Sequence, residues 1–288
     1  MLLDHSDIQT KEVLNWKGFN LLHFAGSACS QKLRIFLNLK EIDWISHHID
    51  LTKNEQFDSW YLGINPRGLV PTLVHNGNVY IESNDIMQYI ESVNTDVVLF
   101  PNEHINEIIE SLEYEDSLHI DLRTLTFRFI VPHKIGKKDL KLLDEKENFK
   151  GTIQGDLDRN KQKEIDFWKQ HYKNGITDDQ VIKSANNFIV ALDKLEKKLC
   201  ENKYILNDNL SILDVAWFIS INRIIIAGFP VKYNYPNIKA WFQMLSSDKR
   251  FSSEVKGNMP LFILKNTLGL YNFFKKRRLI DIVKFENL

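Results

Sequence analysis

Residues 65–74 read Asn65-Pro66-Arg67-Gly68-Leu69-Val70-Pro71-Thr72-Leu73-Val74, and they are the most informative part of the chain. Pro71 opens a run with strand character, where a proline cannot donate a ladder hydrogen bond. Pro71 therefore has to lie at the start of a strand. A cis Val70-Pro71 bond at this point would be a deliberate feature. Such a bond would turn the N–H and C=O groups of Val70 outward, where they can pair with an extended peptide.

The residues that follow predict a hairpin and then the start of a helix. Asn76-Gly77 is a strong hairpin signal between strands expected at 72–75 and 79–81. Glu82-Ser83 falls where the second of these strands hands over to a helix. Free N–H groups at the start of a helix bind carboxylates. An exposed extended backbone beside such an anion site predicts a binding site for a small acidic peptide.

Residues 20–92 resemble the glutathione-binding domain of the glutathione S-transferases. Val70-Pro71 matches the cis-proline element of that family. Glu82-Ser83 matches its acidic residue and serine, which hold the γ-glutamyl end of glutathione. The resemblance implies glutathione as a cosubstrate, held by Val70, Pro71, Glu82 and Ser83. The alternative is a thioredoxin-like domain kept only as a scaffold, because a fold by itself does not establish a function.

The pattern of apolar residues and turns predicts the order β-α-β-α-β-β-α for the first part of the chain, which is the thioredoxin-like arrangement of that family. We therefore expect an α/β thioredoxin-like N-terminal domain over residues 18–92, after an N-terminal extension over 1–17. A linker over 93–101 is expected to lead into an all-helical C-terminal domain over 102–288.

The second half of the chain has helical periodicity and no further hairpin pattern. Apolar residues at three- and four-residue spacing predict a long helix over 103–130, which ends before Pro132, and another over 178–199. The polar stretch over about 133–179 is interpreted as an insertion with a short helix at 165–172.

Ser211 and Asp214 have the spacing of a capping box, with Asp in place of Glu or Gln. The following helix, expected over 215–227, is apolar nearly all round, so it is predicted to be buried. A similar box opens the core helix of the second domain in glutathione transferases. The resemblance therefore extends to the helical half, and Asp214 is expected to be structural.

Composition is typical of a globular protein that has no strong electrostatic preference for a polyanion. The formal net charge is −1 and 43% of the residues are hydrophobic, so we expect no nucleic-acid partner. No apolar run approaches the roughly 20 residues of a transmembrane helix, and residues 1–17 do not read as a signal peptide. The two cysteines, Cys29 and Cys200, exclude a disulfide framework and favour the reducing cytoplasm.

The candidate catalytic segment is Ser27-Ala28-Cys29-Ser30, between the first strand and the first helix. Helix N-termini favour anions such as a thiolate. A hydroxyl that donates to the sulfur of glutathione would lower the pKa of its thiol, and Ser27 is the first choice for this donor. The segment resembles the Ser-Ser-Cys motif of zeta-class transferases, with Ala28 in place of the second serine. That departure argues against strict zeta-class isomerisation of maleyl acids.

Two alternatives to Ser27 remain open in the same segment. Cys29 could form a mixed disulfide with glutathione, or it could be a small buried side chain on the first helical turn. Ser30 is better explained as a polar residue of that turn, although contact with the sulfur is the alternative. No Cys-x-x-Cys motif is present, which argues against a dithiol oxidoreductase.

Lys53 follows the second strand, where the family often places a polar side chain on the glycine carboxylate of glutathione. A solvent-exposed lysine is the alternative interpretation. His47 and His48 alternate on a strand, so they are expected to face opposite ways and not to form a metal pair. We expect no metal cofactor.

Residues 57–68 together with His75-Asn76-Gly77 resemble the bacterial glutathione-dependent β-etherases, as does the long insertion. That resemblance implies a small aromatic electrophile and thiolate attack on an aryl ether. Related sequences carry out other conjugations and reductive dehalogenations. The rival interpretation is a non-catalytic protein of the same fold that carries a ligand or serves in assembly.

The family resemblance also implies a homodimer. From the sequence, only the many apolar positions in 103–130 support that expectation. The tail over 259–288 mixes apolar and basic residues, including Phe273-Phe274-Lys275-Lys276-Arg277-Arg278. An interfacial helix is one interpretation of this tail. We expect instead a packed C-terminal helix, because each apolar run is short.

Overall fold

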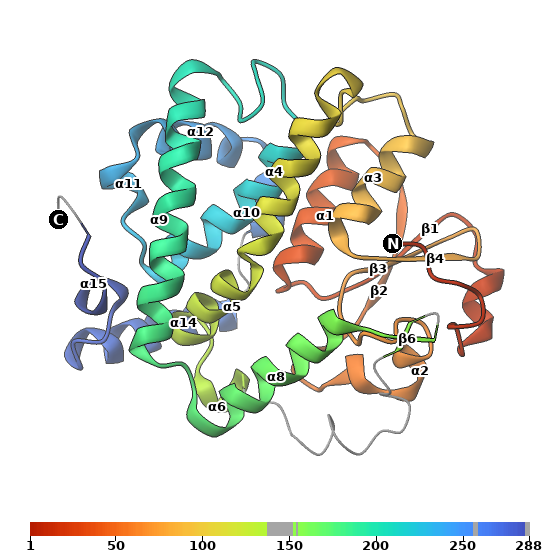
Figure 1. Ribbon diagram of the computed structural model, residues 1–288, viewed down its shortest axis with the longest axis horizontal. Helices are drawn as coiled ribbons and strands as arrows, with labels where there is room; N and C mark the ends of the chain where they lie inside the picture. Colours follow the sequence, from red (N-terminus) through yellow and green to blue (C-terminus); the bar gives the residue numbers. More distant parts are fainter. Residues whose placement is uncertain (137–151, 154, 256–258, 286–288) are drawn as a thin grey trace. The chain divides into compact units, whose positions relative to one another are not determined.

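Residues 1–136, 152–153, 155–255 and 259–285 are described by the computed structural model. The chain divides into two units, which are described separately below (Figure 1). The first contains Met1–Asn94 together with Gly136–Gly175, and the second contains Thr95–Ile135 together with Ile176–Leu288. This grouping differs from the expected boundaries, because most of the insertion belongs to the first unit and not to the helical one.

A four-stranded mixed sheet forms the centre of the first unit, in the strand order β2-β1-β3-β4. Strand β1 pairs parallel with β2 and antiparallel with β3, and β3 pairs antiparallel with β4 across the predicted Asn76-Gly77 turn. The expected order of elements is confirmed by β1 (Phe19–His23), α1 (Ala28–Leu39), β2 (Trp44–His48), η2 (Glu55–Phe57), α2 (Ser59–Leu62), β3 (Thr72–His75), β4 (Asn78–Ile81) and α3 (Ser83–Val93).

The two faces of the sheet carry different parts of the hydrophobic core. Successive side chains on a strand point to opposite faces, so Leu21 and Leu73, which are paired in the register and fully buried, share one face. The helices α1 and α3 pack side by side (Figure 1). Leu22 and Val74 belong to the other face, where they share a core cluster with Tyr61 of α2.

The N-terminal extension is part of this unit. Leu2 bridges to Tyr80, and the N–H of Leu3 donates to the carbonyl of Val79 at 2.9 Å. A 3-10 helix, η1 (Lys11–Asn15), follows. Leu3, Ile8 and Val13 are buried in the same cluster as Leu22 and Val74. Residues expected only to precede the domain therefore extend the edge of its sheet and complete one side of its core.

The insertion contributes a small hairpin and a helix. Strands β5 (Thr152–Ile153) and β6 (Asp156–Leu157) pair antiparallel, and α8 (Arg159–Asn174) follows. The helix is twice as long as the one expected at 165–172, because Asp158 caps its N-terminus by accepting from the N–H of Asn160. Trp168 is buried on this helix, and Ile153 packs against the core of the first unit.

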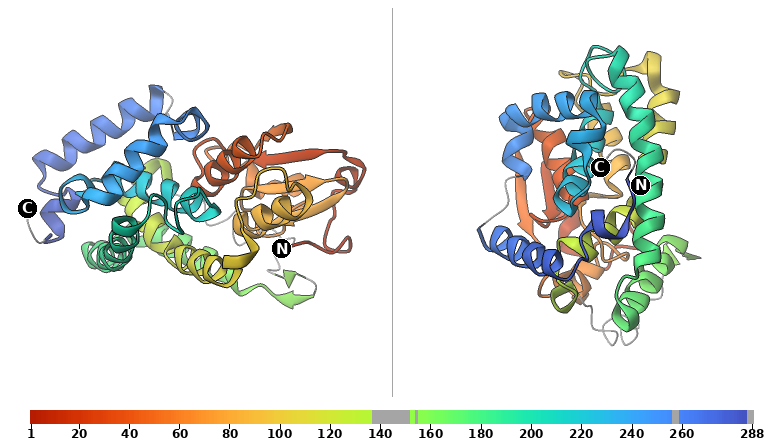
Figure 2. Two further views of the ribbon diagram at one scale, coloured as in Figure 1. Left: turned by 90° about the horizontal axis from the view of Figure 1, so that it is seen from above. Right: turned by 90° about the vertical axis from the view of Figure 1, so that its left-hand side faces the viewer.

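The second unit is helical. The single helix expected over 103–130 is wrong, because the chain breaks at Leu118 between α4 and α5. The long helix α9 packs against α5 and α12, and α5 in turn packs against α10 (Figure 2). Its elements are η3 (Asn102–His104), α4 (Ile105–Ser117), α5 (His119–Phe129), α6 (His133–Gly136, whose last residue falls in the first unit), α9 (Asp178–Glu201), α10 (Ile212–Ala227), α11 (Val231–Asn234), α12 (Pro236–Ser247), α13 (Lys249–Val255), α14 (Met259–Phe274) and α15 (Leu279–Ile282).

Asp214 occupies the start of the buried helix α10, as predicted. Its carboxylate accepts from the N–H of Ser211 at 2.9 Å and from the Ser211 hydroxyl at 3.0 Å. The same side chain also accepts from the N–H of Ile205 at 3.0 Å and the indole N–H of Trp241 at 2.8 Å. Asp214 therefore ties α10 to the preceding loop and to α12, a wider role than a helix cap.

In the described parts of the chain, we found no helix with both the length and the apolar character that crossing a bilayer requires.

Candidate functional site

The strand register brings four separate segments to one end of the sheet. Leu22 near the end of β1 pairs with Thr72 at the start of β3, and Thr72 pairs with Ile81 at the end of β4. The turn after β1, the residues before β3 and the start of α3 therefore meet at this end. Strand β2 runs parallel to β1, so the turn that carries Lys53 follows at the same end. The predicted Ser27, Val70 and Ser83 are thus brought together.

Val70 precedes β3, and its bond to Pro71 is cis, as predicted. The Val70 side chain packs against the core cluster of the first unit. Within the described ranges, no hydrogen bond engages the N–H or the C=O of Val70. An extended backbone with both groups available can accept a further strand-like peptide.

Two side chains of the first unit hold the segment before Val70 in place. The Tyr61 hydroxyl donates to the carbonyl of Leu69 at 2.5 Å, and the Asn65 amide donates to the same carbonyl at 2.9 Å. Both side chains also contact the hydroxyl of Thr72, each at 2.9 Å. Tyr61 is fully buried, which raises the pKa of its phenol. Neither Tyr61 nor Asn65 was predicted to support the site, although Asn65 belongs to the motif at residues 65–74.

Glu82 and Ser83 form the junction between β4 and α3. Glu82 has φ 66° and ψ 117°, a backbone conformation that residues other than glycine rarely adopt. Such a residue costs on the order of 1–3 kcal/mol and is often found at functional sites. No side chain caps this end of α3, so its first N–H groups are open to an anion. Ser83 is the first helical residue and is only 7% exposed.

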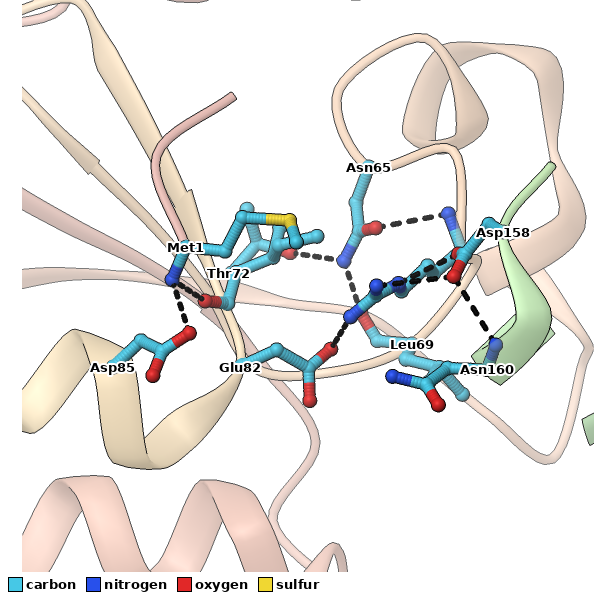
Figure 3. A network of polar contacts seen from close by, with 10 residues as sticks. Met1, Asn65, Leu69, Thr72, Glu82, Asp85, Asp158 and Asn160 are labelled. Atoms are coloured by element: carbon cyan, nitrogen blue, oxygen red, sulfur yellow. Dashed lines mark hydrogen bonds and ion pairs between the residues drawn. The ribbon is translucent and has the colours of Figure 1, made fainter. Parts of the chain in front are cut away.

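Arg67 connects Glu82 of this junction to Asp158 of the insertion, and Figure 3 shows these two acidic residues within one network of polar contacts. Its guanidinium donates to Oε1 of Glu82, and it donates to both carboxylate oxygens of Asp158, at 2.7 Å and 3.1 Å. Burial works against the charge of Arg67, but the hydrogen bonds and charges of the two acids outweigh it and raise the pKa of the guanidinium. Oε2 of Glu82 has no donor in the part of the chain that the structure describes.

Lys161 provides a second contact between the insertion and the same loop. Its ammonium donates to the carbonyl of Pro66, next to Arg67. Burial lowers the pKa of Lys161 to about 8, although the charge of Asp158 opposes the shift. Sequence reasoning did not find Arg67, Asp158 or Lys161 as parts of the site, because Arg67 and Asp158 lie 91 residues apart.

Ser27 lies directly before α1, as predicted, and it also caps the N-terminus of this helix. Its hydroxyl oxygen accepts from the N–H of Ser30 at 3.3 Å. No acceptor for the Ser27 hydroxyl proton was found among the described residues, so this proton can be donated to a ligand. Ser30 is fully buried, and its oxygen lies 3.5 Å from the N–H of Phe24. Cys29 is half-buried on the first turn and is not in a disulfide.

The turn that carries Ser27 rests on a buried pair, Arg34 and His23. Arg34 donates to the carbonyl of Ala25 at 3.1 Å and to Nδ1 of His23 at 3.1 Å. Burial and the charge of Arg34 lower the pKa of His23 to about 4, so the ring is neutral at pH 7. A guanidinium can only donate, so the proton of His23 lies on Nε2, which is 2.8 Å from the hydroxyl of Ser46.

Two family models match the chain: the N-terminal domain of glutathione S-transferases over residues 26–93, and the C-terminal domain of glutathione S-transferases over residues 181–249. The chain therefore contains segments that match both domains of the glutathione S-transferases, as the resemblance implied. The first match covers α1 to α3 with the strands β2 to β4, and includes Ser27, Val70 and Ser83. The second covers the region of α9 to α12.

Similar proteins include transferases and related enzymes of the superfamily. A zeta-class glutathione S-transferase of Euphorbia esula is 42% identical over 71 residues, 25% of this chain and 32% of the relative. The first curated relatives are matched over only about a third of their length, from 32% to 38%. A tetrachloro-p-hydroquinone reductive dehalogenase of Sphingobium chlorophenolicum is 22% identical over 81% of this chain and 94% of the relative.

Among solved structures, the β-etherase LigF from Sphingobium sp. strain SYK-6 superposes with a TM-score of 0.69. The match covers 82% of this chain and 98% of the etherase, at 23% identity. At this identity the superposition establishes the fold. The glutathione S-transferase fold, with a thioredoxin-like first domain and a helical second domain, is therefore confirmed for this chain.

The remaining predicted site residue is Lys53. Its side chain is 72% exposed, and its ammonium lies 3.4 Å from the carboxylate of Asp50. The position at the sheet end suits a ligand carboxylate, and the exposure leaves the side chain able to move.

His47 and His48 have different neighbours, as expected for adjacent residues of a strand. His47 hydrogen-bonds to Asn20 and stacks on Trp16, whereas the ring of His48 lies beside that of Phe24. In the described ranges, no three His, Cys, Asp or Glu side chains are grouped as a metal site.

Proposed function

We propose that this protein binds glutathione at the end of the sheet and activates its thiol for attack on a small aromatic electrophile. The observation that carries the proposal is the convergence of Ser27, Val70 and Ser83 at one sheet end. Ser27 offers its hydroxyl proton and Val70 offers its N–H and C=O, and these groups have no partner among the described residues. Ser83 lies at a helix N-terminus that has no side-chain cap. Together they match a short peptide that carries a thiol and a carboxylate.

Each part of glutathione has a complementary group at this site. The N–H and C=O of Val70 would pair with the cysteinyl residue, which adds a short strand to the sheet edge. The N–H and hydroxyl of Ser83 would hold the γ-glutamyl carboxylate at the start of α3. Oε2 of Glu82 would accept from the γ-glutamyl ammonium, and Lys53 would approach the glycine carboxylate. Arg67 would keep Glu82 oriented for this contact, because it already binds Oε1.

Ser27 is the proposed catalytic residue. Its oxygen accepts from the N–H of Ser30, which orients the hydroxyl. The hydroxyl would then donate to the sulfur of glutathione and favour its thiolate form. An ordinary thiol has a pKa of about 8.5, so this donation would increase the thiolate fraction at pH 7. The N-terminus of α1 adds a favourable electrostatic contribution.

The more specific form of the proposal names the reaction as cleavage of an aryl ether. The sulfur would form a bond to the carbon that carries the aryloxy group, the carbon–oxygen bond would break, and the phenolate would leave with the electron pair and take a proton from water. The similarity to proteins named β-etherase and reductive dehalogenase supports an aromatic substrate. A screen of aryl ethers, aryl halides and disulfides with glutathione would distinguish these reactions.

Calorimetric titration with glutathione tests the binding site. Ser83→Ala removes a hydrogen bond to a charged group, so affinity should fall by roughly 1.5–3 kcal/mol. Ser92→Ala is the matched control, because Ser92 lies on the same helix but only bonds back to the carbonyl of Tyr89. Equal glutathione affinity in the wild type and Ser83→Ala would contradict the proposed site.

A second candidate function is a glutathione-dependent thiol reductase that uses Cys29. The half-buried thiol on the first turn of α1 supports it, because a helix N-terminus stabilises a thiolate. In that case the Cys29 thiolate would attack the glutathione sulfur of a mixed disulfide between glutathione and a substrate. A disulfide between Cys29 and glutathione would form, and the substrate would leave as a thiolate. The third candidate, a non-catalytic carrier of the same fold, would bind glutathione but give no product in the screen above.

We also propose that the protein is a homodimer, as the family resemblance implies. Exposed apolar side chains on the second unit, Val98 at 59% and Ile105 at 40%, are consistent with a further contact surface. Sedimentation equilibrium tests this: a fully active species of 33.9 kDa would show that dimerisation is not required.

A further inference from the structure

The end of α14 carries four large apolar side chains that are open to solvent. The exposed fractions are 60% for Leu270, 53% for Tyr271, 52% for Phe273 and 73% for Phe274. Single exposed apolar residues are common on protein surfaces and need no explanation. Four within five consecutive residues form a patch, and such patches usually mark an interaction site. We refer to these four residues as the aromatic end of α14.

Helical geometry places these side chains close together. Leu270, Phe273 and Phe274 have the i, i+3, i+4 spacing of one helix face, and Tyr271 lies beside them. The helix lies at the outer edge of the second unit, where it packs against α5 (Figure 2). The C-terminal helix therefore packs against α5, as expected of a packed helix, but its last turn is exposed.

Four consecutive cations, Lys275 to Arg278, follow directly after the aromatic end. Lys276 has a left-handed φ of 50°, and the N–H of Arg277 donates back to the carbonyl of Asn272 at 2.9 Å. This tight turn keeps the cations next to the aromatic side chains. Arg278 lies over the ring of Phe273, 4.9 Å from its centre. Lys275, Lys276 and Arg277 are exposed.

The tight turn is anchored to the unit by residues outside the patch. Leu279 is 1% exposed and Val283 is 4% exposed, and both belong to the segment of α15. Arg278 also forms an ion pair with Asp281 at 2.8 Å. The patch is thus held on a fixed turn by buried side chains, so its exposed residues can be changed without removing the anchor.

We propose that the aromatic end of α14 and Lys275–Arg278 bind the surface of an anionic membrane. Aromatic side chains favour the headgroup level of a bilayer, and adjacent Lys and Arg residues are attracted to anionic lipids. The formal net charge of the whole chain is −1, so the attraction would be confined to this basic end. The protein would lie on the membrane surface and would not span it.

Two other partners for this surface, a second copy of the chain and a nucleic acid, fit its charge and its apolar side chains less well. A two-fold contact with a second copy sets the same patch against itself, which would bring two runs of four cations together. A nucleic acid would bind the cations, but Leu270 and the apolar faces of Phe273 and Phe274 would gain less from a phosphate backbone than from lipid. An anionic lipid surface satisfies the apolar and the basic parts together.

Co-sedimentation with vesicles tests the proposal, with phosphatidylcholine alone and with added phosphatidylserine. We expect binding only to the vesicles that contain phosphatidylserine, and we expect added salt to weaken it. Phe273→Ser/Phe274→Ser and Lys275→Glu/Lys276→Glu should each lower vesicle affinity by more than about tenfold. The matched control is Tyr233→Ser/Lys232→Glu, where an exposed tyrosine lies under an adjacent lysine on α11.

Several results would overturn the proposal: no vesicle binding, equal binding to neutral vesicles, or equal loss in the control variant. A change of oligomeric state in Phe273→Ser/Phe274→Ser without vesicle binding would assign the surface to a second copy. Competition by an oligonucleotide with the same variant sensitivity, and no vesicle binding, would assign it to nucleic acid. Glutathione affinity should stay unchanged in every variant, which separates this test from that of the proposed function.

Discussion

The guanidinium of Arg67 binds both carboxylate oxygens of Asp158, at 2.7 Å and 3.1 Å, although the two residues lie 91 positions apart. Both side chains are about 95% buried. Asp158 also caps α8, and Arg67 also binds Glu82 at the start of α3. The pair therefore attaches the insertion to the loop of the cis-proline element and fixes one side of the proposed glutathione site.

Replacement of Asp158 should destabilise the first unit. Asp158→Ala leaves the buried Arg67 with one partner, and loss of one member of a buried ion pair costs roughly 3–5 kcal/mol. Urea unfolding measures this effect, and glutathione titration should show weaker binding because Glu82 loses part of its support. Asp248→Ala is the control, since the side chains of Asp248 and Arg250 are 28% and 48% exposed and the contribution of such a pair should be about 1 kcal/mol. Equal effects of the two variants would contradict this role for Asp158.

Ser27→Ala should raise the pKa of the bound glutathione thiol toward the ordinary value of about 8.5. Each unit by which that pKa rises above 7 lowers the thiolate fraction at pH 7 about tenfold. Turnover should fall accordingly while glutathione affinity changes little. Ultraviolet thiolate absorbance against pH measures the shift directly, and Cys29→Ala serves as the comparison. An unchanged absorbance profile in Ser27→Ala, with disulfide exchange abolished in Cys29→Ala, would favour the thiol reductase instead.

His23 should make the fold sensitive to acid. Its pKa is about 4 in the folded protein and about 6.5 when unfolded, so between these values only the unfolded state binds the proton. The stabilising effect of the neutral ring is complete above pH 6.5 and is lost as the pH falls toward 4. His23→Gln should reduce the drop in urea midpoint between pH 7 and pH 5, whereas the exposed His5→Gln should not. Parallel pH profiles for all three proteins would exclude His23 as the cause.

Asp214→Asn should destabilise the helical unit. Oδ1 accepts from the N–H groups of Ile205 and Trp241, and Oδ2 accepts from the N–H of Ser211. Whichever oxygen the amide group replaces, it would face N–H donors from which it cannot accept. Hydrogen bonds to charged groups contribute about 1.5–3 kcal/mol each, so a loss of roughly 3 kcal/mol or more is expected. Chemical unfolding followed by tryptophan fluorescence would report it. A loss below about 1 kcal/mol would mean that the cap contributes little.

Most of the first unit could be predicted because its signals are local. The missing N–H of Pro71 indicates a strand start, Asn76-Gly77 indicates a tight turn, and Ser27 comes directly before a helical pattern. These signals involve residues within a few positions of each other. They led to the start of β3, the hairpin between β3 and β4 and the position of Ser27 before α1, all of which the structure has. The cis Val70-Pro71 bond followed from the family resemblance and is also present. The site roles of Ser27, Val70, Ser83 and Lys53 remain predictions.

Local signals were insufficient where distant segments meet. Helical periodicity continues through Leu118, so the break between α4 and α5 was not visible in the pattern. The exposed end of α14 also could not be read from an apolar pattern, because periodicity does not report what covers a helix face.

The start of β3 at Pro71 and the turn at Asn76-Gly77 could be located from the chain alone, because backbone chemistry constrains proline and glycine, and the resemblance to glutathione S-transferases supplied the fold. Three features appear only in three dimensions: Asp158 joins Arg67, Arg34 keeps His23 neutral, and Phe273 and Phe274 stay in solvent. Burial and ion pairing depend on which surfaces pack together in space. A contact between residues far apart in the chain cannot be recognised from the local sequence pattern.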